Sequence, residues 1–272
     1  MKRLVWFTAV LIASAAFAGE VEEYRELAKR YDSEAIERKA EASMPVSPEA
    51  RAIYIRALAR TFGSNAIAAA DALRRDHPND PWSWYAVAMA SQQSMITFAR
   101  FEPATAKMME LATNPSDAMI ALRVTALIDA KKDDAAAALL EGKQSPALLA
   151  AKASLLLNQV WTKKDDALAE KALLLFEEAR KLDPSFLEGY VRASQQLRSK
   201  RRNAEAHALM KQAAALTPAL TVHREYWTTV RADQSVPEEK KREEIDADIA
   251  ALMKERGDWL PVLAEIANEY AA

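Results

Sequence analysis

Apolar positions recur along most of the chain with the period of an α-helix. In the clearest stretch, apolar or small residues stand at spacing i, i+3, i+4 and i+7, which places them on one helical face. These residues are Tyr190, Ala193, Ser194 and Leu197. A polar turn over 200–203 separates them from a second stripe formed by Ala206, Met210 and Ala213. Runs that alternate apolar and polar residues, as half-buried strands do, are missing, so the pattern predicts an all-α protein.

The pattern also repeats with a longer period. Pro184 and Pro218 stand 34 positions apart and enclose the two stripes. Proline ends a helix because it lacks the amide donor and restricts the residue before it. The preceding helix carries the second stripe 34 positions earlier, at Ala172, Phe176 and Ala179. Such self-similarity predicts stacked helical hairpins, since a single hairpin cannot bury its apolar face alone.

This unit resembles the tetratricopeptide repeat (TPR), in which large, small and proline residues occupy fixed positions of a 34-residue hairpin. With Leu187 as position 1, positions 4, 7, 8, 11, 20, 24, 27 and 32 are Tyr190, Ala193, Ser194, Leu197, Ala206, Met210, Ala213 and Pro218. Nearer the start, the matching residues are Ala66, Ala70, Leu73, Pro78, Trp84, Val87, Ala88 and Ser91. The resemblance implies a right-handed superhelical solenoid of about six helical hairpins. Divergent repeats of this type and a related helical-hairpin array stay open.

Four segments follow from this interpretation. We expect a signal peptide over 1–18, an N-terminal helix over 19–46, one repeat array over 47–257 and a C-terminal helix over 258–272. The last segment has two interpretations. It is either the cap that ends a solenoid, or the first helix of a further hairpin whose second helix is not in this chain.

The first eighteen residues have the pattern of an export signal. Lys2 and Arg3 precede a short apolar stretch, and Ala16-Phe17-Ala18 gives the small-x-small pattern that signal peptidase reads. The stretch is shorter than the about 20 apolar residues that cross a bilayer. We therefore predict cleavage after Ala18 and a periplasmic or secreted protein without an integral membrane span, with an uncleaved N-terminal anchor as the alternative.

Composition argues against several kinds of chemistry. The chain has no cysteine and only 5 glycines, so neither thiolate sites nor glycine-rich phosphate loops are expected. Its 3 histidines are far apart and outside metal-binding motifs. Without Lys2 and Arg3, the 37 basic residues fall to 35 against 39 acidic ones, which disfavours nucleic acid. We expect no metal, no cofactor and no catalytic site.

The resemblance also implies where a partner binds. In the tetratricopeptide family, the first helix of each hairpin lines a concave groove. The corresponding residues here are Arg51, Ile55, Trp82, Tyr85, Met89, Gln92, Gln93, Gln195 and Arg198. Trp82 and Tyr85 have aromatic rings that suit a peptide platform. The alternative is that both rings pack inside the array.

The predicted function is a non-catalytic scaffold that binds a protein or peptide partner in this groove. One alternative makes the chain the N-terminal helical-repeat portion, or a subunit, of a larger exported enzyme, for example one with a thioredoxin-like domain. Another makes it an assembly factor that associates with itself through the open ends of the solenoid.

Overall fold

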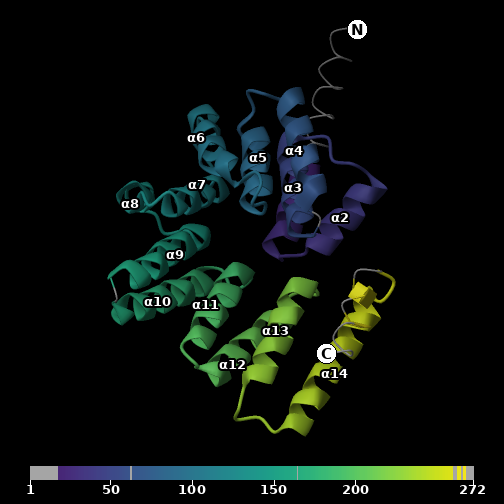
Figure 1. Ribbon diagram of the computed structural model, residues 1–272. Coiled ribbons are helices and arrows are strands. Elements are labelled where there is room, and N and C mark those ends of the chain that lie inside the picture. The colour runs from purple at the N-terminus through teal and green to yellow at the C-terminus, as the bar shows by residue number, and fades with distance from the viewer. Residues whose placement is uncertain (1–17, 62, 164, 260–261, 265, 268–272) are drawn as a thin grey trace. The chain divides into compact units, whose positions relative to one another are not determined.

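The computed structural model describes residues 18–61, 63–163, 165–259, 262–264 and 266–267, and every regular element in that part is helical. The elements are a helix over residues 18–29, α2 (Ser33–Ala42), α3 (Pro48–Thr61), α4 (Gly63–Asp76), α5 (Pro81–Gln92), the 3-10 turn η1 (Phe98–Arg100), α6 (Phe101–Leu111), α7 (Asp117–Asp129), α8 (Asp133–Leu140), α9 (Pro146–Lys163), α10 (Asp166–Leu182), α11 (Leu187–Ser199), α12 (Asn203–Ala214), α13 (Leu220–Ala232) and α14 (Glu238–Arg256), shown in Figure 1. The predicted all-α class is confirmed.

The chain divides into two compact units. The N-terminal unit contains the residues up to 28 and residues 35–139, and the C-terminal unit contains residues 29–34 and 140–272. The array expected over 47–257 is therefore shared between two units.

In the N-terminal unit, consecutive helices from α3 to α7 pack on one another, and α3 also contacts α5. The second contact joins the first helices of neighbouring hairpins, as hairpin stacking requires. The repeat positions Ala66, Leu73 and Ala88 are fully buried. The small side chains of Ala66 and Ala88 allow the helices to approach closely.

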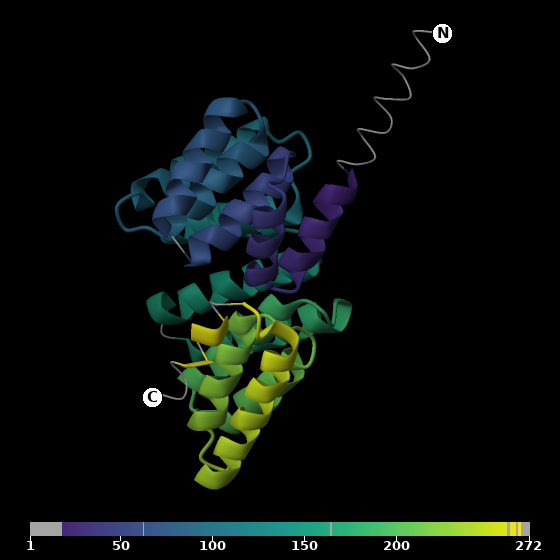
Figure 2. The ribbon, with the colours of Figure 1, turned by 90° about the vertical axis from the view of Figure 1, so that its right-hand side faces the viewer.

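In the C-terminal unit, each helix from α9 to α14 packs on the next, and α11 contacts both α9 and α13. Figures 1 and 2 both show α13 and α14 side by side. The apolar positions of the 34-residue period lie in the interior, with Ala172, Phe176, Ala179, Ala206, Met210 and Ala213 fully buried, whereas Pro184 is exposed and Pro218 is partly exposed. Stacked helical hairpins are confirmed, while the handedness of the superhelix stays a prediction.

The N-terminal region differs from the single helix expected over 19–46. It forms two helices that are separated at residues 30–32, where Tyr31 has a positive φ of 61°. The helix ends here because groups of Arg30 and Asp32 bind residues of the C-terminal unit. The carbonyl of Arg30 accepts a hydrogen bond from the Thr217 hydroxyl at 2.8 Å, and buried Asp32 pairs with Arg256. We call residues 29–34 the strap.

The predicted signal lies outside the described residues, apart from Ala18, which begins the first helix. In the predicted C-terminal helix, residues 262–264 and 266–267 are helical, and Val262 and Ile266 are buried. Among the described residues, no helix combines the length and apolar character needed to span a membrane.

Candidate binding pocket

The C-terminal unit contains an open pocket of about 680 Å³ between α12, α13 and α14. The end of α12 and the connection after it form one apolar wall, and α14 forms the other. The apolar lining residues are Ala214, Ala215, Leu216, Pro218, Ala247, Ala251 and Leu252. Polar side chains complete the lining, namely Arg30, Lys211, Thr217, His223, Tyr226, Glu244, Asp248 and Glu255.

One face of α14 supplies much of this lining. Glu244, Asp248 and Glu255 follow one another at i, i+4 and i+11, which places them along a single side of a helix. Ile245 and Ile249 are buried in the core of the unit. Their burial fixes the rotation of α14, so the acidic face is held toward α12 and α13.

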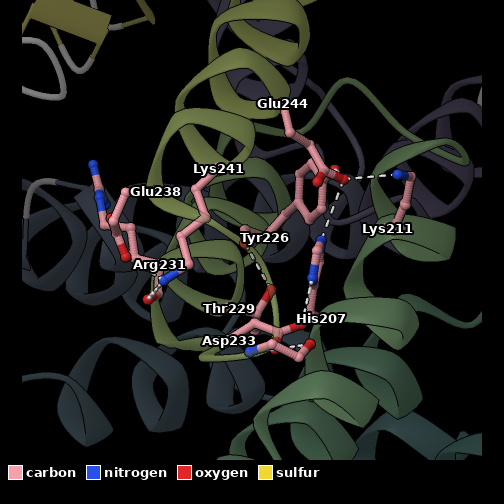
Figure 3. A network of polar contacts seen from close by, with 10 residues as sticks. His207, Lys211, Tyr226, Thr229, Arg231, Asp233, Glu238, Lys241 and Glu244 are labelled. Atoms are coloured by element: carbon pink, nitrogen blue, oxygen red, sulfur yellow. Dashed lines mark hydrogen bonds and ion pairs between the residues drawn. The ribbon is translucent and has the colours of Figure 1, made fainter.

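Three donors converge on a single oxygen of Glu244. Lys211 Nζ and Tyr226 Oη donate to Glu244 Oε1 at 2.7 and 2.6 Å, and His207 Nε2 lies 3.2 Å from the same atom. Figure 3 shows the His207 ring between Glu244 and Asp233, whose Oδ2 lies 2.9 Å from Nδ1. Burial by itself raises the pKa of Glu244, but these donors outweigh it and lower the pKa to about 2.

Asp248 is held in the same way, one helical turn further on. His223 Nδ1 lies 2.7 Å from Asp248 Oδ2, and Trp227 Nε1 donates to the same oxygen at 2.6 Å. The other ring nitrogen of His223 lies 2.9 Å from the carbonyl oxygen of Thr217. The side chains that orient Asp248 are themselves buried, so the carboxylate is fixed in place.

Each carboxylate therefore has one engaged and one free oxygen. Glu244 Oε2 and Asp248 Oδ1 accept no hydrogen bond from any residue that the structure describes. The basic residues of the lining are different in character. Arg30 is exposed, and the Lys211 side chain is 64% exposed. The buried donors thus hold the acceptors of the pocket in place, while its lysine and arginine are on exposed side chains.

The two histidines are structural parts of this arrangement. Both ring nitrogens of His207 and of His223 have partners, so neither ring has an unengaged nitrogen for proton transfer in the pocket. Within the described ranges, no three His, Cys, Asp or Glu side chains are grouped so that they could hold a metal ion.

Three residues of the groove predicted from the sequence are in the core of the N-terminal unit. Ile55, Tyr85 and Met89 are buried there, which corrects their assignment to an open surface. The physical reason is that α3 packs on α5. This contact covers the face of α3 that carries Ile55 and the face of α5 that carries Tyr85 and Met89. Trp82 is partly buried and lies edge-on to Tyr85, with ring centroids 5.2 Å apart. The interpretation in which Tyr85 packs inside the array is the correct one.

The other predicted groove residues are at least partly accessible. Arg51 pairs with Asp76 at 3.6 Å, and Gln92 and Gln93 follow at the end of α5. Gln195 is exposed on α11, where Arg198 pairs with Glu225 of α13 at 3.1 Å. These last two belong to the C-terminal unit and the others to the N-terminal unit. Their role in binding stays a prediction.

The pocket itself was not predicted. The sequence of α14 alternates charges and is typical of a solvated helix face. The signal that distinguishes its inner side is weak. Glu244 and Asp248 are separated by Ile245, Asp246 and Ala247, and Ala251 follows at the next turn, so this stripe has no basic residue. Its donors come from α12 and α13, and no local pattern indicates them.

No profile of a known protein family matches the chain, and no curated protein matches it. Among solved structures, the chain is similar to YrrB, described as a TPR protein with an unusual peptide-binding site. The two share 13% identity over 70% of this chain and 96% of that one, with a TM-score of 0.35. A similarity of this size establishes neither the fold nor the function of this chain. The helical-repeat architecture rests instead on the helix packing and burial of the chain itself.

Proposed function

We propose that this protein is a non-catalytic scaffold that binds a polypeptide partner in the periplasm or outside the cell. The observation that carries the proposal is the pocket between α12, α13 and α14, in which fixed carboxylates lie between two apolar walls. Apolar walls with a few oriented polar groups are typical of a recognition site. Because the pocket is open, it suits one side chain of a longer chain that continues across the surface.

The rigidity of the unit supports the same proposal. Packed helices position Glu244 and Asp248, which we call the floor of the pocket, before any partner arrives. The scaffold therefore loses little conformational entropy on binding. The two histidines already use both ring nitrogens for structural contacts. This supports a binding role over a catalytic one.

Export is a separate part of the proposal and has a separate test. It is supported by the basic, apolar and small-residue pattern of residues 1–18. The mature protein should begin at Gly19, which mass spectrometry of the protein recovered from outside the cytoplasm will show. Recovery of the full chain in the cytoplasm would contradict export and leave the pocket unaffected.

Filling the pocket tests the binding role. Ala251 lines the pocket and is exposed, so Ala251→Trp places an indole in it without disturbing the core. Ala250, the preceding residue, is also exposed but lies outside the lining, so Ala250→Trp is the matched control. Peptides selected from an unbiased display library with the full-length chain should bind Ala251→Trp at least about tenfold more weakly than the wild type. The control should bind them normally.

Two results would count against the proposal. A library that yields no binding peptide would exclude a general peptide-binding scaffold. Peptides that bind Ala251→Trp and the wild type equally well would place the site elsewhere on the chain.

A further inference from the structure

We propose that the pocket between α12, α13 and α14 receives an arginine side chain of the partner polypeptide. This inference rests on the proposed function, because it names the partner group that occupies the same pocket. Its basis is the pair of carboxylates in the pocket lining, Glu244 and Asp248, each with one oxygen that accepts no hydrogen bond from a described residue, together with the apolar walls on either side.

The charge of the occupant follows from which pocket groups are fixed. Glu244 and Asp248 are held by buried or half-buried donors from α12 and α13, and Glu244 stays ionised because its pKa is lowered. Lys211 and Arg30 are exposed side chains that can turn into solvent at low cost. An anion on the floor would face both carboxylates, whereas a cation would meet two acceptors that are already oriented.

The spacing of the acceptors favours arginine over lysine. Residues four apart on a helix have Cβ atoms about 5–6 Å from each other. The guanidinium group has five donors in a planar fork, so it can reach two carboxylates together, whereas an ammonium group is a compact point charge. Arginine is also the more weakly hydrated of the two cations, so transferring it into a partly enclosed site costs less.

The apolar walls of the pocket suit the aliphatic part of the partner's arginine side chain. The side chain of Leu216 is large and apolar, yet the residue is 44% exposed at the pocket. Ala247 and Ala251 face it from α14 and leave room between the walls. The three methylene groups of an arginine would cover Leu216 while the charged end reaches the floor.

Lys211 is the internal competitor for this site. It donates to Glu244 Oε1 at 2.7 Å, although its side chain remains mostly exposed. A guanidinium on the free oxygen of Glu244 would share that carboxylate with a second cation. Removing Lys211 should therefore strengthen the binding of arginine, which is the opposite of the effect expected for a residue that only contacts the partner.

The decisive test compares arginine with its neutral isostere. The probes are capped heptapeptides of six alanines around a central residue, which is arginine, citrulline, lysine or glutamate. They are titrated into the full-length wild-type chain, and the indole N–H resonance of Trp227 is followed by NMR because this group donates to Asp248. The arginine peptide should bind at least about tenfold more tightly than the citrulline peptide, and lysine should fall between them. The preference should weaken as salt is raised.

Two pairs of variants assign this preference to the pocket. The double change Glu244→Gln and Asp248→Asn should abolish the preference for arginine over citrulline, whereas Glu243→Gln with Asp246→Asn, on the same helix but outside the lining, should keep it. Lys211→Met should tighten the arginine peptide about threefold or more, and Lys254→Met should not.

The outcomes separate the two proposals. If library-selected peptides bind and Ala251→Trp blocks them, but arginine and citrulline are equivalent in the wild type, the arginine site is wrong and the scaffold stands. If the glutamate peptide binds best, the pocket is an anion site and the inference is overturned. The wild-type comparison decides the matter even if the double variant fails to fold.

Discussion

Glu244 shows how a carboxylate is kept ionised between packed helices. Burial disfavours its charge, and donors from three side chains offset that cost. The donors belong to α12 and α13, so the charge also ties α14 to both helices. An acidic residue that looks like part of a solvated face is therefore a point of tertiary contact.

This arrangement predicts how stability depends on pH. The pKa of Glu244 is lowered from 4.5 to about 2 in the folded protein, so its contribution is present above about pH 4.5 and is lost as the pH falls toward 2. At pH 7, Glu244→Gln should lower the free energy of unfolding by about 1–3 kcal/mol. At pH 3 the difference from the wild type should be clearly smaller. Urea unfolding at the two pH values measures both.

Glu243→Gln is the control for this experiment, because Glu243 is an exposed residue of the same helix and lies outside the pocket lining. A loss of stability for Glu244→Gln that is equal at pH 7 and pH 3 would show that packing, and not charge, is responsible.

At this scale, sequence reasoning succeeds where a residue's role depends on its near neighbours. The buried alanines of the repeat are predicted because period and size are local properties. The roles of His207 and His223 are not, since their carboxylate partners stand 25 to 37 positions away. The prediction that Tyr85 is on an open surface is wrong for a related reason. Only the packing of α3 on α5 decides which face of α5 is covered.

Among whole elements, the close approach of helices within each hairpin depends on small residues. Ala206 on α12 is fully buried, and α12 packs on both α11 and α13. A larger side chain at this position would have to push a neighbouring helix away, since protein interiors contain few voids.

We expect Ala206→Leu to destabilise the protein by about 1–3 kcal/mol through overpacking. Ala208→Leu changes an exposed alanine of the same helix and should alter the free energy of unfolding by less than about 0.5 kcal/mol. Chemical denaturation of both variants tests the difference. Equal stability of the two would mean that the helices can separate without cost at Ala206.

The break between the helix over 18–29 and α2 is a feature of the secondary structure that the sequence does not predict. The residues around Tyr31 have the composition of a continuous amphipathic helix, and a single helix was the natural expectation. What interrupts it is contact with Thr217 and Arg256, which are 187 and 224 positions away along the chain. Local propensity cannot indicate such partners.

For the molecule as a whole, the strap makes the C-terminal unit discontinuous in sequence. Residues 29–34 lie between two parts of the N-terminal unit along the chain, yet they pack in the C-terminal unit. Asp32 is 2% exposed and pairs with Arg256 at the end of α14, and Lys29 pairs with Asp183 at 3.1 Å. A buried ion pair of this kind costs most when one partner is removed alone.

The strap predicts coupling between two distant positions. Asp32→Asn and Arg256→Gln should each lower the free energy of unfolding by about 3 kcal/mol. The double variant should lose less than the sum, with a coupling energy of about 1–3 kcal/mol. Thermal or urea unfolding of the four proteins gives this value. Additive losses would show that the two side chains act independently in solution.

The strap also sets an order of events during synthesis. A ribosome releases α14 long after the strap, so the Asp32–Arg256 contact must wait until the 224 positions that separate the two residues have been made. Domains normally complete their folding in the order of synthesis, but here the C-terminal unit closes on a segment that left the ribosome first. A nascent chain interrupted before Arg256 would therefore contain all of the N-terminal unit and an unfinished C-terminal unit.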